Sequence, residues 1–318
     1  MRDRASLSSF VDQTYLSPLR KLQNKDGGWG FTRGGESRVE ATAWAVLALQ
    51  EFASPAAVDG TVERGLRFLT GTQGEDGSWA AASGQQEGCW VTSLACWALL
   101  GHQDCAIGLR NGLVWLNNDR PRDSRFWWRL GHRIVDRARL NAQSASFSGW
   151  SWTPDTASWV EPTSYALIVQ KLHTAAPVAD WPRRRELAEA MLYDRMCPQG
   201  GWNCGNPMVY GVAGQPQVGP TVWALIALRD HSERAENRKS LDWLESNRET
   251  VRSPESLALT HIGLNACGRR KATLVEGINQ FQESEALPWS IPAFSWMALA
   301  FSETGQWLKI APDRIDNL

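Results

Sequence analysis

Several features that would place a chain in other classes of protein are missing from this sequence. No stretch of its 318 residues reaches the roughly 18 consecutive apolar residues of a membrane-spanning helix. The first six residues lead into no apolar run of the signal-peptide type. Neither sign of charge is in excess, since 33 lysines and arginines face 34 aspartates and glutamates. We therefore expect a cytoplasmic protein without a nucleic-acid partner, and contact with a membrane surface is the alternative location.

Motifs for common cofactors are also missing. The sequence has no Walker A phosphate loop, no dinucleotide fingerprint, no Gly-x-Ser-x-Gly and no His-Glu-x-x-His. Its six cysteines have no Cys-x-x-Cys spacing and fall in or beside apolar segments, which indicates reduced core residues. We expect no cofactor, no bound metal and no disulfide framework.

A short phrase recurs along the chain. Residues 23–29 and 73–79 both fit Gln-x-x-x-Gly-x-Trp, and looser copies occur at 149–150 and 197–202. A threonine follows the tryptophan by 13 residues in the first three copies and by 19 in the fourth. A repeat of this length indicates one structural unit stacked several times.

Each phrase is followed by a segment that is apolar nearly all round, as at 42–49 and 92–99, which predicts an enclosed helix. More diverged copies lie near 255–267 and 291–303. A mixed charged and apolar helix precedes each one, and its copies lie at 18–22, 65–69, 112–116, 184–196, 240–244 and 277–281. Six such pairs predict an all-α (α/α)6 toroid with six inner and six outer helices. An open solenoid is the rival, but it normally needs polar capping repeats, which the terminal helices lack. The repeat favours a single domain over 1–318, with an insertion at about 119–147.

Tryptophan is abundant, with 18 residues beside 4 tyrosines and 9 phenylalanines. Tryptophans of the repeat phrase are expected to wedge the repeats together. Others at or near the inner helices are candidates for an aromatic lining that binds substrate, and these are Trp44, Trp90, Trp159, Trp223 and Trp296.

Together, the phrase and the Thr-Ala-x-Ala-x-x-Ala-Leu segment at 42–49 resemble the QW repeats of the squalene–hopene cyclase and protein prenyltransferase β-subunit superfamily. The resemblance covers about residues 10–303 and implies that superfamily's toroid, here in a single-domain form. It also implies a small hydrophobic isoprenoid as substrate. A partner subunit, which prenyltransferases require, stays an open question.

The zinc site of the prenyltransferases has no counterpart, because the corresponding stretch 217–221 contains neither aspartate nor cysteine. His261 remains as a substrate-binding candidate, although a lone histidine in an apolar helix is more often a core residue. Class II cyclases carry an Asp-x-Asp-Asp-Thr-Ala acid motif, and the resemblance aligns Glu40 and Glu161 with its central acid. Both positions lack the flanking carboxylates. Arg38, which precedes Glu40 in the same segment, is a further substrate-binding candidate.

Two interpretations of Glu40 and Glu161 stay open. A carboxylate in the first turn of a helix can simply cap it, since it accepts hydrogen bonds from unpaired N–H groups and interacts favourably with the helix dipole. Alternatively, both point into the mouth of the toroid as an acid and a base, on the order of 6–10 Å apart if neighbouring helix axes are spaced as usual. Protonation of an alkene then requires that burial keeps one carboxyl neutral against the dipole.

The insertion at 119–147 contains the run 126–129, Phe-Trp-Trp-Arg, among several other arginines. Three interpretations stay open for this insertion: a solvated helix packed outside the ring, a contact with a membrane surface, or a group of arginines that binds a diphosphate. The glycine- and proline-containing loop 203–216 suits an ordered lid beside the mouth.

Three functions follow from these patterns. The leading hypothesis is an enzyme, a lyase or isomerase that handles an isoprenoid by acid-initiated cyclisation or isomerisation, with Glu161 and Glu40 as catalytic residues. A non-catalytic isoprenoid or lipid carrier on the same fold is the first alternative. The second is an (α/α)6 glycan hydrolase or lyase, in which two carboxyls roughly 6.5–9.5 Å apart would favour inversion.

Overall fold

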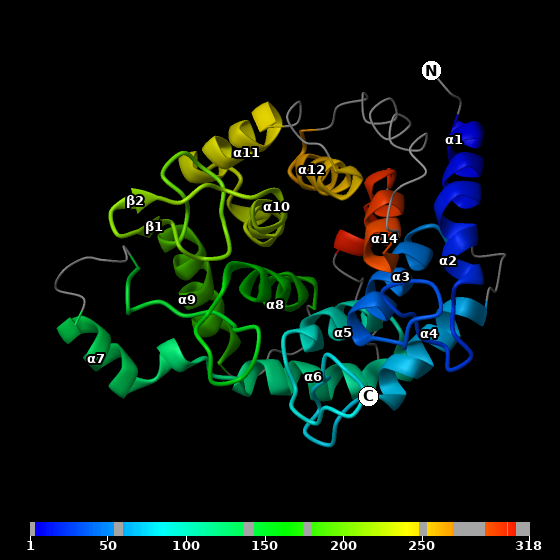
Figure 1. Cartoon of the computed structure of the whole chain (residues 1–318), viewed down its shortest axis with the longest axis horizontal. Coiled ribbons are helices and arrows are strands. Elements are labelled where there is room, and N and C mark those ends of the chain that lie inside the picture. Colours follow the sequence, from blue (N-terminus) through cyan, green and yellow to red (C-terminus); the bar gives the residue numbers. More distant parts are fainter. Residues whose placement is uncertain are drawn as a thin grey trace.

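The computed structural model describes residues 4–53, 60–135, 143–173, 180–247, 253–269, 290–303 and 305–309. The regular secondary structure of this part of the chain is almost entirely helical, as expected for an all-α protein (Figure 1). The described residues include six apolar helices, and from the first to the fifth a more polar helix separates each from the next. They are α3 (Val39–Glu51), α5 (Val91–Leu99), α8 (Val160–Leu172), α10 (Val218–Ala227), α12 (Pro254–Ala266) and α14 (Ile291–Ala300).

These six helices form a closed inner ring. Each packs against the next in chain order, and α14 packs against α3, which closes the ring (Figure 1). Nearly every residue of α3, α5 and α10 is buried, because neighbours cover these helices on all sides. The (α/α)6 toroid is thereby confirmed against the open solenoid, whose first and last repeats would not meet.

The outer helices lie around this ring (Figure 1). The helix α4 packs against α3 and α5, α6 against α5, α9 against α8, and α11 against α10 and α12, while the short α2 touches α14. Their bounds are α2 Ser17–Lys21, α4 Gly60–Gly71, α6 Ala106–Asn118, α9 Trp181–Asp194 and α11 Ala235–Asn247. The sixth predicted outer copy, at 277–281, lies outside the described residues. Before α2 the chain forms α1 (Arg4–Val11) and a π-helical turn, Asp12–Leu16.

Hydrogen bonds explain the recurrent phrase. The backbone N–H of Trp29 donates to Thr42 Oγ1 at 2.9 Å, and its indole N–H donates to the carbonyl of Leu19 at 2.8 Å. Trp79, Trp150 and Trp202 repeat both bonds with the equivalent threonine and leucine. Each tryptophan therefore joins the C-terminal end of an outer helix to the first turns of an inner helix. This is the wedging role expected from the sequence.

Glycines of the outer helices allow this close approach. A Cβ atom at Gly112 of α6 would lie 2.5 Å from Cys96 Sγ and 2.8 Å from the Trp79 ring. Gly65 of α4 meets Val46 and Trp29 in the same way, at 2.6 Å and 3.0 Å. A methyl group cannot occupy such a space without a shift of the packed neighbours.

Two segments at the outer-to-inner connections differ from plain helical turns. The predicted lid contains a small antiparallel hairpin, β1 (Met208–Val209) with β2 (Val212–Ala213), which the sequence patterns did not predict. The insertion forms a 3₁₀ turn, Arg122–Ser124, and the helix α7 (Phe126–Val135). Among the described helices, none is both long enough and apolar enough to cross a bilayer.

Candidate active site at the inner-helix N-termini

The two candidate glutamates occupy equivalent places on the ring. Glu40 is the second residue of α3 and Glu161 is the second residue of α8, and α3 and α8 both flank α5. All inner helices run in the same direction, because each is reached through an outer helix that returns the chain to its starting end. Both side chains therefore lie in the first turn at one end of the toroid, which we call the mouth.

Burial raises the pKa of both carboxyls to about 7. For Glu161, loss of hydration is the cause. For Glu40, loss of hydration is the larger cause, and the negative charge of Glu161 raises its pKa further. The two carboxyls are thus close enough to repel, so their protons leave as a coupled pair. Because this repulsion is mutual, loss of the first proton from the pair makes the second proton harder to remove.

Capping does not account for these residues. Among the described residues, neither carboxylate receives a hydrogen bond that would lower its pKa, and neither has a basic partner. The N-cap positions, Arg38 and Trp159, also make no side-chain capping bond. A capping carboxylate near a helix N-terminus would have a lowered pKa. Loss of hydration is the largest cause of the raised pKa at both positions.

One turn deeper, aromatic rings fill the axis of the toroid. The sixth residue is Trp44 in α3, Tyr165 in α8, Trp223 in α10 and Trp296 in α14. The Trp44 ring contacts the other three, at centroid distances of 6.2 Å, 5.1 Å and 5.7 Å in that order. The helices α3 and α10 lie on opposite sides of the ring. Contact between Trp44 and Trp223 therefore closes the axis at this level, and we call these four side chains the aromatic floor.

The remaining predicted site residues lie around this arrangement. Trp90, just before α5, stacks on Tyr165 at 5.8 Å and meets Trp152 at 4.8 Å, so it joins the cluster above the floor. Trp159 is half-buried at the start of α8. Arg38 forms an ion pair with Glu36 at 2.9 Å, which satisfies part of its charge. His261 is half-buried on α12.

Several residues near the carboxyls were missed from the sequence. Tyr165 is fully buried, and the charges of both glutamates add to the burial that raises its hydroxyl pKa. It follows Thr163 by two residues, as Trp44 follows Thr42 and Trp223 follows Thr221, so the repeat itself contained this signal. Glu40 acts electrostatically on Cys89 and Glu161 acts on Cys204, and both thiols have raised pKa values, chiefly from burial. A Cβ at Gly219, on α10, would lie 3.6 Å from Glu161 Oε1.

A buried ion pair fixes the loop that leads into α8. Arg195 lies 3.3 Å from Asp123 Oδ2 and donates to the carbonyl of Ser158 at 2.7 Å. Asp123 also accepts the backbone N–H and the hydroxyl of Ser158, at 3.1 Å and 2.8 Å. Since Ser158 precedes Trp159 and the first turn of α8, this network positions the helix start that bears Glu161.

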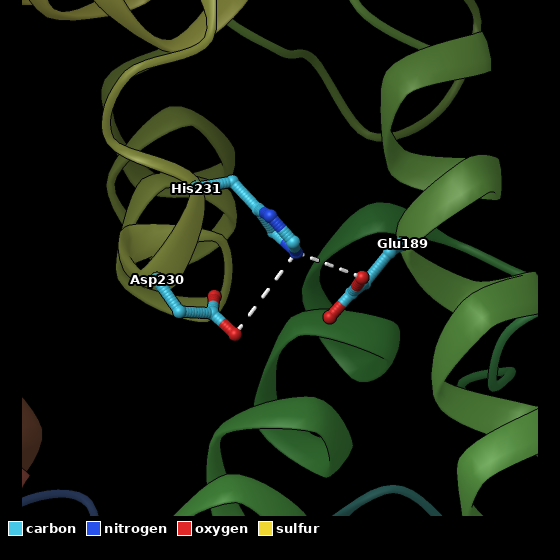
Figure 2. A group of neighbouring side chains, drawn as sticks. All are labelled: Glu189, Asp230 and His231. Atoms are coloured by element: carbon cyan, nitrogen blue, oxygen red, sulfur yellow. Dashed lines mark hydrogen bonds and ion pairs between the residues drawn. The ribbon is translucent and has the colours of Figure 1, made fainter.

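A second cluster of ionisable groups lies at the opposite end of the toroid. Figure 2 shows the side chains of Glu189, Asp230 and His231 facing one another. Their oxygen and nitrogen atoms lie within 4.8 Å of one another. His231 Nε2 lies 3.0 Å from Glu189 Oε2. The Lys171 ammonium lies 2.7 Å from Glu189 Oε1 and 2.6 Å from Asp230 Oδ1. The Lys171 ammonium thus already pairs with both carboxylates of the cluster. The cluster joins the C-terminal ends of α8 and α10 to α9.

Comparison with known proteins places the fold. No known protein family and no curated protein matches the sequence. Among solved structures, the type II terpene cyclase MstE from Scytonema is similar over 96% of this chain and 100% of its own, with a TM-score of 0.63 and 10% identity. A protein from Actinoplanes is similar over 94% and 98%, with a TM-score of 0.57 and 14% identity. A cold-adapted family 8 xylanase is similar over 95% and 92%, with a TM-score of 0.52 and 10% identity.

These similarities define the class of protein by its fold. The chain is an α/α toroid, a fold similar to that of a type II terpene cyclase and of a xylanase. At such low identity the similarity reaches no further than the fold, so chemistry has to be argued from the site.

Proposed function

We propose that the chain is an enzyme that starts cyclisation or isomerisation of an isoprenoid by protonating a carbon–carbon double bond at the mouth. The observation that carries this proposal is the pair Glu40 and Glu161, whose pKa values burial raises to about 7. A general acid works best when its pKa lies near the working pH, and these carboxyls meet that requirement.

The coupling between the two carboxyls suggests their roles. In the assignment that we propose, Glu161 is the ionised member of the pair, and its charge raises the pKa of Glu40 further. Glu40 then donates its proton to one alkene carbon, whose π electrons form the new C–H bond and leave a carbocation. Glu161 accepts a proton from a carbon next to the cation, which restores a double bond. The net result of these steps is an isomerised isoprenoid and a proton moved from Glu40 to Glu161. In a cyclisation, the π electrons of a second double bond in the same substrate attack the cation before proton loss and form the C–C bond of the ring.

The surroundings support an apolar substrate. Among the described residues, the ionisable groups whose pKa values the two carboxyls raise are the thiols Cys89 and Cys204 and the buried Tyr165, none of which is a charged partner for a substrate. Aromatic faces below can stabilise a cation. Because the aromatic floor closes the axis one turn down, the reacting part of the substrate lies in the shallow layer above Trp44 and Trp223.

A glycan hydrolase is the second candidate, favoured by the same carboxyl pair and by the similarity to the family 8 xylanase. The test is organic extraction of the purified protein with mass spectrometry, followed by turnover assays on prenyl diphosphates, squalene and a glycan panel. We expect a prenyl product from the wild type and at least a 100-fold loss in Glu40→Gln and Glu161→Gln. Glu63→Gln, an exposed first-turn residue of the outer helix α4, is the matched control.

The outcomes separate the three functions. Reducing-sugar release that depends on both glutamates would assign the glycan reaction instead. A co-purified isoprenoid that binds equally well to all variants, with no product, would assign the carrier. Prenyl turnover unchanged in both Gln variants would overturn the mechanism.

A further inference from the structure

Among the described residues, six of the nine exposed large apolar side chains lie on two projections at the mouth end. On α7, Phe126 is 69% and Trp127 is 79% exposed. On the β1–β2 hairpin, Tyr210 is 77% and Val212 is 70% exposed. Both projections belong to connections that lead from an outer helix to the next inner helix, which places them at the end where the glutamates lie. Figure 1 shows α7 and the hairpin projecting from the same side of the molecule.

Three apolar residues near the start of α7 point away from the body. Phe126, Trp127 and Leu130 form the exposed side, with Leu130 at 40%. Arg129 instead faces inward, where it donates to the carbonyl of Asp123 at 3.0 Å and to Ser148 Oγ at 3.1 Å. A surface helix normally buries its apolar face and hydrates its charges. The reversed orientation leaves aromatic area in water, which costs free energy unless another phase covers it.

The hairpin presents an aromatic residue in a conformation that disfavours it. Val209 pairs with Val212, so Tyr210 and Gly211 form a two-residue turn, with φ of 50° and 79°. Turns of this kind prefer asparagine and glycine, because both central residues adopt positive φ. A tyrosine there is strained and gains nothing from packing, since its ring is largely exposed. Strain held at an exposed tip indicates a contact made outside the chain.

The segment that bears α7 contacts the loop that bears the hairpin, and it contains an excess of arginine. Gln143, which follows α7 in the chain, donates to the Gly205 carbonyl at 2.7 Å and to Asn206 Oδ1 at 2.6 Å. Residues 119–135 contain five arginines and two aspartates, in a chain whose net charge is −1. Arg120 pairs with Asp180 and Arg125 with Asp155, while Arg122 is exposed beside α7.

We propose that α7 and the β1–β2 hairpin together dock on an anionic lipid surface and turn the mouth toward it. Tryptophan, phenylalanine and tyrosine enter the interfacial layer, where an apolar ring and a polar edge are both solvated. Arginines near the surface add attraction to anionic headgroups. Separate projecting tips suit a soft lipid phase better than a rigid protein partner, which needs a continuous complementary patch. The proposal concerns location only and does not depend on the chemistry at Glu40 and Glu161.

The test is co-sedimentation of the full chain with vesicles of phosphatidylcholine alone and of phosphatidylcholine with about 30% phosphatidylserine. We compare the wild type with Trp127→Ala/Tyr210→Ala and with the control Ile107→Ala. Ile107 is 78% exposed at the start of α6, at the opposite end of the toroid. All three side chains are exposed, so the substitutions should leave the fold intact, which circular dichroism checks.

We expect the wild type to bind the anionic vesicles, more weakly at high salt, and the double variant to lose at least about tenfold in partition coefficient. The control should bind like the wild type. Absence of wild-type binding to either vesicle, or an equal loss in Ile107→Ala, would overturn the proposal. So would a wild-type dimer in sedimentation velocity that the double variant abolishes while vesicle binding persists, because the projections would then serve self-association.

Discussion

Replacing Glu161 by glutamine should stabilise the protein, and only at higher pH. Burial raises the carboxyl pKa from 4.5 to about 7, so the folded chain resists ionisation that the unfolded chain accepts freely. A group with a raised folded-state pKa contributes its full stability below the unfolded value, and that stability is lost as pH rises toward the folded value. The window therefore runs from about pH 4.5 to about pH 7.

The size of the effect follows from the same shift. Each pKa unit corresponds to about 1.4 kcal/mol, so ionisation of Glu161 lowers the free energy of unfolding by at most about 3 kcal/mol above pH 7. Glutamine imitates the neutral acid at every pH. The advantage of Glu161→Gln over the wild type should be near zero at pH 4 and should approach that limit at pH 8. Glu40→Gln should behave alike, and the double variant should gain less than the sum because the two charges repel.

Urea unfolding followed by circular dichroism, at pH values between 4 and 8.5, measures this difference. Glu63→Gln on α4 is the control and should give a difference that does not change with pH. The reasoning is refuted if Glu161→Gln destabilises the protein at pH 8, or if its effect is the same at pH 4 and pH 8. Either result would mean that the carboxylate is hydrated or paired in the folded chain.

Other parts of the structure give further predictions. Trp29→Phe removes the indole N–H that donates to the Leu19 carbonyl, and it should lower the free energy of unfolding, measured by urea denaturation, by about 1–3 kcal/mol. An unchanged value would show that this bond does not hold the two helices together. Gly112→Ala should lower the free energy of unfolding by about 1–3 kcal/mol, because the added methyl group meets Cys96 and Trp79. Gly71→Ala should be tolerated, because no atom lies within 4 Å of the added methyl group. Equal melting temperatures in the two variants would contradict this prediction. Asp123→Ala should lower the free energy of unfolding by about 3–5 kcal/mol, because the buried Arg195 loses its ion-pair partner. A variant as stable as the wild type would show that water already hydrates this pair.

The repeat predicted the parts of the fold that depend on local sequence. The tryptophan-to-threonine spacing marked the start of α3, α5, α8 and α10, because one hydrogen bond joins those two residues in every copy. The placement of Glu40 and Glu161 in first turns followed from those starts. The Tyr165 position was predictable from the same register but was missed, since a tyrosine interrupts the tryptophan pattern.

Other features depend on contacts between distant segments. The aromatic floor forms because α3 and α10 lie close enough for Trp44 and Trp223 to touch across the ring. The sequence pattern does not reveal how close these two helices lie. The burial that raises the pKa of Glu161 depends on what covers the mouth, which its first-turn position alone does not reveal. The ion pairs of Lys171 with Glu189 and Asp230 join residues from three separate elements. The outward orientation of α7 is decided by Arg129 bonding to the body, although its amphipathic pattern equally suits packing on the ring.

The most direct measurement for the central claim is an infrared pH titration of the carboxyl C=O stretch in the wild type and in the two Gln variants. Near pH 6, when ordinary glutamates are ionised, the wild type should show the band of a neutral carboxyl, because burial raises the pKa of Glu40 and Glu161 to about 7. The band should weaken in each single variant and disappear in Glu40→Gln/Glu161→Gln. A wild-type spectrum without that band at pH 6, or a band unchanged in the double variant, would contradict an acid at the mouth of the toroid.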